Sequence, residues 1–129
     1  MGCWAAPIVP RRGGVGESRL YQSSLAGCLL SVLHGVCYGP GARLTLHQDK
    51  NERDLTAPIV SVSLGLPAVF LFGGATRNQR PVRVPLVHGD VVVWGGPDRL
   101  RYHGVLSLKD GHHLRLGSHR FNLTFRRAG

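Results

Sequence analysis

The sequence contains no apolar run of the roughly 18 to 20 residues that a helix needs to cross a lipid bilayer. It is also poor in acidic residues, since 7 Asp and Glu stand against 16 Lys and Arg and give a formal net charge of +9. The first absence predicts no membrane-spanning segment. The second predicts attraction to polyanions, above all nucleic acid, although a solvated basic surface explains the charge equally well.

Cysteine is scarce as well. Cys3, Cys28 and Cys37 include no CxxC pair and no zinc-finger spacing, and their odd number argues against a disulfide framework. The apolar stretch at residues 24–36 follows several arginines, as a signal peptide would, but lacks a convincing small-residue cleavage site. We therefore expect a cytoplasmic protein.

The length of 129 residues suits one domain with a hydrophobic core, and 18 Gly with 8 Pro indicate many turns. From residue 37 onward, short alternating or apolar runs are separated by turn signals, which predicts an all-β sandwich or barrel. A hairpin turn is expected at residues 109–113, and the longest polar connection at 51–58. The expected strands lie within residues 42–49, 58–66, 68–74, 83–94 with a turn at 88–90, 101–108 and 119–127.

His47 and Asp49 stand two residues apart at the end of the first of these runs, "ARLTLHQDK". Side chains two apart in a strand share a face, so both can reach one metal ion. A second histidine would complete a triad of two His and one carboxylate, which leaves open coordination positions and suits non-haem Fe(II). The pair alone is weak evidence, because a strand-end His beside a solvated Asp is common.

The third ligand must come from another histidine. His103 begins a strand after a Gly-rich loop and is the best placed by pattern, while His119 stays open. The remaining histidines lie in turns or in the N-terminal region and are expected to be exposed or structural: His34, His88, His112 and His113.

The run "RFNLTFR" at residues 120–126 alternates between an apolar face and a polar face. Arg120, Asn122 and Arg126 belong to the polar face. In a closed barrel their guanidinium groups would lie inside, where an unpaired charge is costly, and they would need an anionic partner. A small dicarboxylate would match two arginine forks and an amide. The alternative is a solvent-exposed face on an edge strand.

Together these segments resemble the catalytic core of the AlkB family, Fe(II)- and 2-oxoglutarate-dependent dioxygenases that repair alkylated DNA. The resemblance runs from about Tyr38 to Gly129, in the family's order and with its separations. The segments that carry it are "YGPGARLTLHQDK", "APIVSVSLGLPAVFLFGG", "HGDVVVWGG", "RLRYHGV" and "RFNLTFRRAG".

The resemblance implies a double-stranded β-helix, or jelly roll, that is incomplete at its N-terminal side. It implies Fe(II) held by His47, Asp49 and His103, which favours His103 as the third ligand. It further implies that 2-oxoglutarate and molecular oxygen are co-substrates. Arg120 and Tyr38 would hold the distal carboxylate of 2-oxoglutarate, and Arg126 and Asn122 the end that chelates iron.

The implied activity is oxidative demethylation of N-alkylated bases, such as 1-methyladenine and 3-methylcytosine, in DNA or RNA with release of formaldehyde. Single-stranded DNA is the expected partner and a monomer the expected state. Arg77 and Asn51 would lie beside the substrate base, whereas Trp94 is expected to pack in the core.

The chain departs from the family's pattern in three places. Val36 replaces an Asn that contacts 2-oxoglutarate, and Asn51 replaces an Asp that contacts the base, which leaves base preference open. Residues 1–36 do not match the family's nucleotide-recognition lid, and we expect them to be disordered or mistranslated from a shifted frame or wrong start, with the dioxygenase core at 37–129. The alternative to an active demethylase is a truncated, impaired fragment that keeps the metal and 2-oxoglutarate site. A basic barrel that binds nucleic acid without oxidation is a third possibility.

Overall fold

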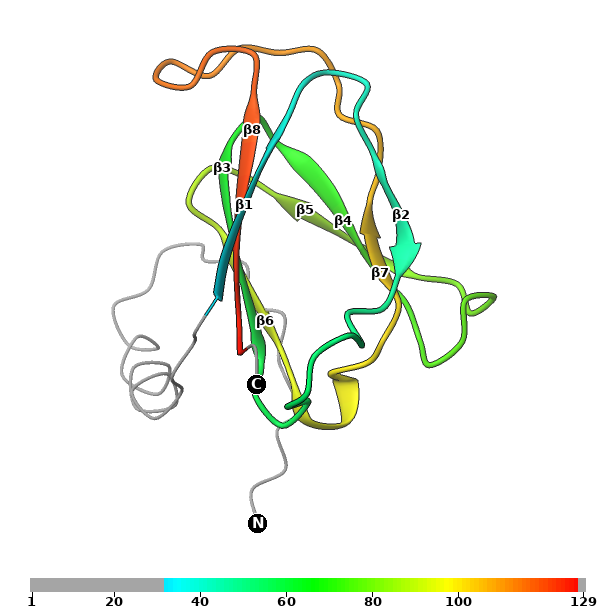
Figure 1. Ribbon diagram of the computed structural model, residues 1–129. Helices are drawn as coiled ribbons and strands as arrows, with labels where there is room; N and C mark the ends of the chain where they lie inside the picture. The colour runs from blue at the N-terminus through cyan, green and yellow to red at the C-terminus, as the bar shows by residue number, and fades with distance from the viewer. Residues whose placement is uncertain (1–31, 128–129) are drawn as a thin grey trace, which may run out of the picture.

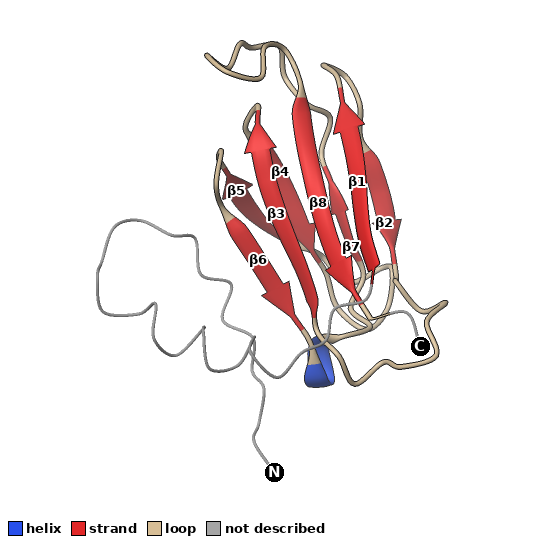
Figure 2. Ribbon diagram, turned by 60° about the vertical axis from the view of Figure 1, so that its left-hand side comes forward, coloured by secondary structure: helices blue, strands red, loops and turns tan. Residues whose placement is uncertain are grey.

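The computed structural model describes residues 32–127, which form two antiparallel four-stranded sheets that face each other (Figures 1 and 2). One short 3-10 helix, η1 (Gly96–Asp98), follows the sixth strand. Within this range no helix is long and apolar enough to cross a membrane. The strands are β1 (Val32–Tyr38), β2 (Leu44–His47), β3 (Ile59–Gly65), β4 (Ala68–Phe72), β5 (Val82–Leu86), β6 (Val91–Trp94), β7 (His103–Val105) and β8 (Arg120–Arg126).

The strand order is β1-β8-β3-β6 in one sheet and β2-β7-β4-β5 in the other. Most neighbours in these sheets are far apart in sequence, so the chain passes repeatedly from one sheet to the other, as in a jelly roll. The predicted all-β double-stranded β-helix is therefore confirmed.

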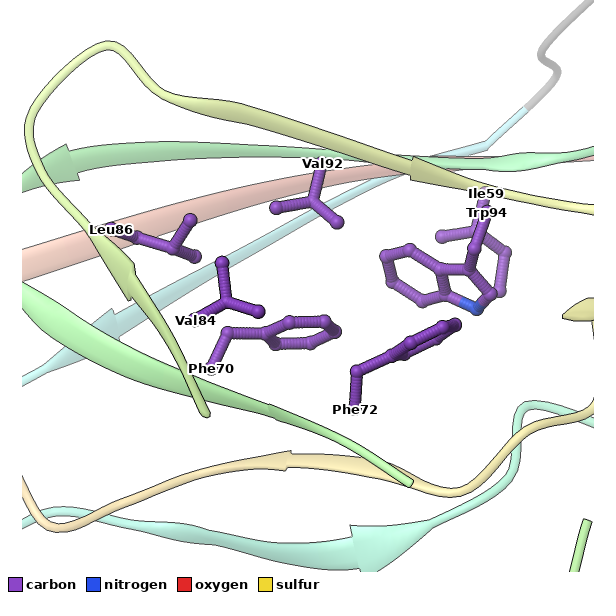
Figure 3. Packing of buried hydrophobic residues seen from close by; sticks show 7 residues of the cluster. All are labelled: Ile59, Phe70, Phe72, Val84, Leu86, Val92 and Trp94. Atoms are coloured by element: carbon purple, nitrogen blue, oxygen red, sulfur yellow. The ribbon is translucent and has the colours of Figure 1, made fainter. Parts of the chain in front are cut away.

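A hydrophobic core lies between the two sheets (Figure 3). It follows from strand alternation, because every second residue of a strand faces the opposite sheet. β3 and β6 contribute side chains from one sheet, and β4 and β5 from the other. The buried cluster consists of Ile59, Phe70, Phe72, Val84, Leu86, Val92 and Trp94.

The inner face of β8 is polar, and this face positions the site. β8 lies between β1 and β3, so it is a central strand, and the alternative of a solvent-exposed edge strand is wrong. Arg120 and Asn122 bond to the hydroxyls of Ser63 and Ser61 on β3. The barrel interior therefore has an apolar region, formed by β3 to β6, and a polar region that follows β8.

Two segments differ from the sequence-based expectation. β1 begins at Val32 and pairs with β8 from Val32↔Arg126 to Tyr38↔Arg120, so the predicted boundary between residues 36 and 37 falls inside this strand. Residues 1–31, to which the reading-frame hypothesis mainly applies, lie outside the described range. The turn predicted at 109–113 is wrong. β7 already ends at Val105, and the tight turn lies further along the chain, where His113 and Gly117 form a bridge. Gly117 has a φ of +61°, which a glycine adopts readily.

Gly65 is the glycine whose replacement should damage the fold most clearly. Its φ is +85°, and a Cβ there would lie 2.2 Å from the backbone oxygen of His119. Gly89 has a similar φ of +89° but open space around it. We expect Gly65→Ala to reduce the free energy of unfolding by about 2–5 kcal/mol, and the control Gly89→Ala by about 1–2 kcal/mol. Urea denaturation of both variants measures the difference, and equal losses would contradict the close contact.

Candidate metal centre

The pairing of β2 with β7 brings two histidines together. His47 and His103 are opposite each other in this antiparallel pair, and their ring centroids lie 4.4 Å apart. The two strands approach closely at Gly104, where a Cβ would come within 2.6 Å of the Leu44 carbonyl oxygen. A glycine is therefore required beside His103 for the strands to meet in this way.

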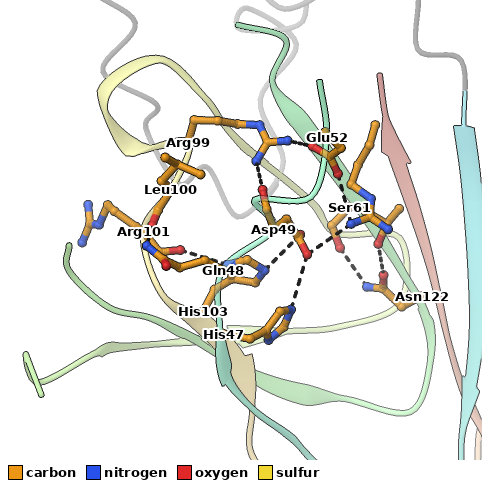
Figure 4. Close-up of polar contacts among 12 residues, drawn as sticks. His47, Gln48, Asp49, Glu52, Ser61, Arg99, Leu100, Arg101, His103 and Asn122 are labelled. Carbon is orange, nitrogen blue, oxygen red and sulfur yellow. Dashed lines mark hydrogen bonds and ion pairs between the residues drawn. The ribbon is translucent and has the colours of Figure 1, made fainter. Parts of the chain in front are cut away.

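The carboxylate of Asp49, two residues beyond β2, lies between these histidines (Figure 4). Its Oδ1 is 3.6 Å from His47 Nε2, and its Oδ2 is 3.3 Å from His103 Nε2. One ligand atom from each of the three residues lies within 4.8 Å of the others, close enough for one metal ion. The donor set of two imidazole nitrogens and one carboxylate is that of non-haem Fe(II) sites. His119, the alternative third ligand, is exposed and does not belong to this group.

Both imidazole rings are fixed by their second nitrogen. The Nδ1 of His47 lies 2.9 Å from the Thr45 carbonyl oxygen, and the Nδ1 of His103 lies 3.0 Å from that of Arg101. A neutral ring that donates from Nδ1 keeps the lone pair of Nε2 free. Each Nε2 therefore faces the centre of the group as a potential metal ligand, in the arrangement by which proteins orient such histidines.

The group is electrostatically coupled in the absence of metal. Burial raises the pKa of Asp49, but the hydrogen bonds to His103 and His47 and the charge of Arg126 outweigh it, and the pKa lies well below its usual range. The hydrogen bond to Asp49 raises the pKa of His47 against the opposing effect of burial. These contacts therefore favour the anionic form of Asp49, which is the form that binds a cation.

Arg126, from the end of β8, lies next to this carboxylate. Its Nη1 is 3.1 Å from Asp49 Oδ1 and 3.2 Å from Glu52 Oε1. Glu52 also pairs with the buried Arg99. Sequence reasoning missed Glu52 and Arg99, because both lie in irregular segments where no period indicates which side chains turn inward.

Arg120 is a buried cation without a carboxylate partner. Its side chain is only 1% exposed, and burial lowers its pKa. Its Nη2 donates to Ser63 Oγ at 2.9 Å, its Nε has no hydrogen-bond partner, and its Cζ lies 5.7 Å from the centre of the Tyr38 ring. No ion pair among residues 32–127 includes it. A buried guanidinium with an unused donor fits an anionic ligand.

Asn122 lies between Arg120 and Arg126 on the same face of β8. Its Nδ2 donates to Ser61 Oγ at 2.8 Å, and its Oδ1 accepts from Thr124 at 2.7 Å. Arg120, Asn122 and Arg126, predicted to bind 2-oxoglutarate, thus follow β8 from the buried cation towards the metal group. Tyr38, at the end of β1, is opposite Arg120 in the β1–β8 pair. Sequence reasoning did not identify Ser61 and Ser63 as partners of these side chains. Their alternation with apolar residues in "IVSVSLG" nevertheless indicates a polar inner face on β3.

The predicted substrate residues lie at the surface. Asn51 is exposed in the loop after Asp49, and Arg77 is exposed in the loop between β4 and β5. The Cζ of Arg77 lies 5.5 Å from the ring centre of Tyr102, the residue before His103. Trp94 is buried in the core with its ring 4.8 Å from His103, as expected for a packing residue.

The other histidines with described side chains lie elsewhere. His88 accepts a hydrogen bond from the Gly65 amide, and its ring stacks on His113 at 4.3 Å. His112 is exposed. These positions agree with the structural or exposed roles predicted for them. The side chain of His34 lies outside the described part of the chain.

Residues 35–126 match the 2OG-Fe(II) oxygenase superfamily, and the chain belongs to this family. Within it the resemblance to AlkB is confirmed. The chain is 63% identical over 111 residues to the alpha-ketoglutarate-dependent dioxygenase AlkB of Salmonella typhimurium, covering 83% of this chain and 51% of the relative. It is 64% identical over 92 residues to AlkB of Escherichia coli, covering 71% and 43%.

A solved structure gives the same result for the fold. "The structure of OsALKBH1" superposes with a TM-score of 0.67 at 36% identity, covering 74% of this chain and 48% of that one. The chain thus spans about half the length of these two AlkB relatives.

The raised pKa of His47 predicts how stability depends on pH in metal-free protein. The pKa of His47 in the folded protein lies above its ordinary value of 6.5. Its protonated form therefore stabilises the fold fully below pH 6.5, and this stabilisation is lost as the pH rises through the pKa of the folded protein. We expect the free energy of unfolding to fall from pH 6 to pH 8 more steeply in the wild type than in His47→Gln. Urea denaturation in chelator at both pH values measures this. Equal slopes would contradict the His47–Asp49 interaction.

Proposed function

We propose that this chain is the catalytic core of an Fe(II)- and 2-oxoglutarate-dependent dioxygenase that demethylates N-alkylated bases in nucleic acid. The observation that carries the proposal is a His-Asp-His group beside a line of polar residues that ends at a buried, unpaired Arg120. The relatives' names support it, since they are alpha-ketoglutarate-dependent dioxygenases.

Each residue then has a defined task. Nε2 of His47, Nε2 of His103 and the Asp49 carboxylate hold the iron, which supplies the activation of oxygen coupled to oxidation of 2-oxoglutarate to succinate and carbon dioxide. Arg120 and Tyr38 bind the distal carboxylate of 2-oxoglutarate, where the guanidinium gains the anion it lacks. Arg126 and Asn122 bind the carboxylate nearer the iron.

The substrate is an N-methyl group on a base. Hydroxylation of this methyl makes its C–N bond labile, so formaldehyde leaves and the unmodified base remains. A base inside a duplex cannot reach a site between two sheets, so single-stranded nucleic acid is the favoured substrate. Relatives are named as a tRNA demethylase and as a DNA N(6)-methyladenine demethylase, and both DNA and RNA are therefore candidates.

We propose that the chain acts as a monomer in the cytoplasm.

A second candidate is an impaired fragment that retains metal and 2-oxoglutarate binding but not base recognition. The observation that favours it is that the chain covers only 51% and 43% of the length of the two AlkB relatives. The two candidates share the co-substrate site and differ only in demethylation.

The co-substrate site is tested by anaerobic titration of 2-oxoglutarate into protein loaded with Fe(II), followed by the visible absorption band of the chelate. We expect Arg120→Met and Arg126→Ala each to raise the dissociation constant at least about tenfold, since each removes a charged hydrogen-bond partner. The control Arg43→Ala removes an exposed arginine and should bind like the wild type. A folded wild-type protein without the band would contradict the proposed site.

Product analysis separates the two candidates. The active enzyme is expected to release formaldehyde and succinate in equal amounts from single-stranded DNA that contains 1-methyladenine or 3-methylcytosine. The impaired fragment would form succinate without formaldehyde. The Asp49→Asn variant, which weakens the metal site, should form neither product.

The loop between β4 and β5 is suited to the phosphate backbone of the substrate. It carries the exposed Arg77 and Arg80, with Arg83 following on β5, and no Asp or Glu occurs between residues 73 and 89. Two backbone hydrogen bonds join the start of the loop to Tyr102, the residue before His103: the Gly73 amide donates to the Tyr102 carbonyl, and the Tyr102 amide donates to the Gly74 carbonyl. The start of this basic loop therefore lies beside the metal group.

Replacing these three arginines with Gln should weaken binding of single-stranded DNA and reduce the slope of log affinity against log salt by about 2, since each phosphate contact contributes about 0.7. The matched control replaces three exposed cations elsewhere, Arg53, Lys109 and Arg115, with Gln. Fluorescence anisotropy at several salt concentrations measures both slopes. Equal slopes for the two triple variants would show that only net charge matters.

A further inference from the structure

Arg99 is a buried arginine that contacts three points of a single loop. It follows η1, is 3% exposed, and lies under the connection from β2 to β3. Its Nε donates to the Ala57 carbonyl oxygen at 3.0 Å and its Nη1 to that of Asp49 at 2.8 Å. Its Nη2 pairs with the Glu52 carboxylate (Figure 4).

The contact with the main chain of Asp49 matters because the sheet does not hold this residue. The ladder between β2 and β7 ends at the His47↔His103 pair, and β2 itself ends at His47. Beyond that point, the side chain of Gln48 donates a hydrogen bond to the Leu100 carbonyl oxygen. The carbonyl oxygen of the following residue, Asp49, accepts a hydrogen bond from the side chain of Arg99. The segment 99–100 therefore continues the support that the strand pairing provides up to His47.

We propose that Arg99 is a positioning residue of the metal centre, which fixes the Asp49 main chain so that its carboxylate faces both histidines. The proposal rests on the proposed function, because it takes Asp49 to be a metal ligand. Arginine suits this task because its planar fork serves three acceptors at once. A lysine offers one point of charge on a flexible stem.

A positioning role and a simple charge effect predict opposite signs. If Arg99 acted only as a nearby positive charge, its removal would reduce repulsion and strengthen the binding of a dication. If Arg99 orients Asp49, its removal weakens binding, because the carboxylate is no longer held between the two Nε2 atoms. Lysine distinguishes the two cases further, since it keeps the charge but not the three-point contact.

The experiment is a titration with Mn²⁺ alone, followed by electron paramagnetic resonance, on folded wild type, Arg99→Met and Arg99→Lys. Loss of a group that orients a ligand typically reduces metal affinity 10–100-fold. We expect a loss in this range for Arg99→Met and at least tenfold for Arg99→Lys. The control Arg127→Ala removes an ion pair with Asp54, which lies in the same loop; the Arg127 Nη1–Asp54 Oδ2 distance is 3.0 Å. The Mn²⁺ affinity of this control should stay within twofold of that of the wild type.

Thermal unfolding of each metal-free variant shows which samples are folded. If Arg99→Met does not fold, Arg99→Lys carries the test. Affinity equal to or tighter than wild type in either folded Arg99 variant would overturn the proposal, even if its melting temperature falls. A wild type that binds no Mn²⁺ would instead refute the metal site itself, together with this inference.

Discussion

The site depends on the meeting of β2 and β7 at one pair of residues, His47 and His103. Their antiparallel register places both imidazoles side by side, and a glycine next to His103 allows the strands to approach. Because each ring is fixed through Nδ1 by a main-chain carbonyl, both Nε2 atoms face the same point. Asp49 supplies the negative charge at that point, so the strand pairing that joins β2 to β7 also forms the proposed metal site.

The second constraint is the buried charge of β8. A guanidinium inside a barrel costs several kcal/mol unless an anion or a hydrogen-bond network compensates it. Ser63 satisfies only part of Arg120, whereas Arg126 is neutralised by Asp49 and Glu52. The interior is therefore neutral near the metal group and positive at its far end. One carboxylate of a dicarboxylate could pair with Arg120 while the other reaches the metal group, which is the physical basis of the proposed co-substrate.

Much of this could be predicted from the sequence, and the reasons are specific. Period-2 patterning identified the strands that follow β1 and the polar face of β8. The family motifs favoured His103 over His119, which pattern alone had left open. The turn at 113–117 was missed because both Gly111 and Gly117 are plausible turn residues and only packing selects one. Arg99 and Glu52 were missed because irregular loops give no period from which to infer burial. The seven residues of β1 include five from the region expected to be unmatched, and all seven pair with β8.

The central claim is that two histidines from paired strands ligate one metal ion together with Asp49. Pulsed electron paramagnetic resonance of the Mn²⁺-loaded protein tests it directly, because it detects nitrogen nuclei bound to the metal. The account predicts two coordinated imidazole nitrogens in the wild type, one in His47→Ala, one in His103→Ala, and two in the control His119→Ala. A spectrum without imidazole coupling in the wild type, or loss of coupling in His119→Ala, would contradict it.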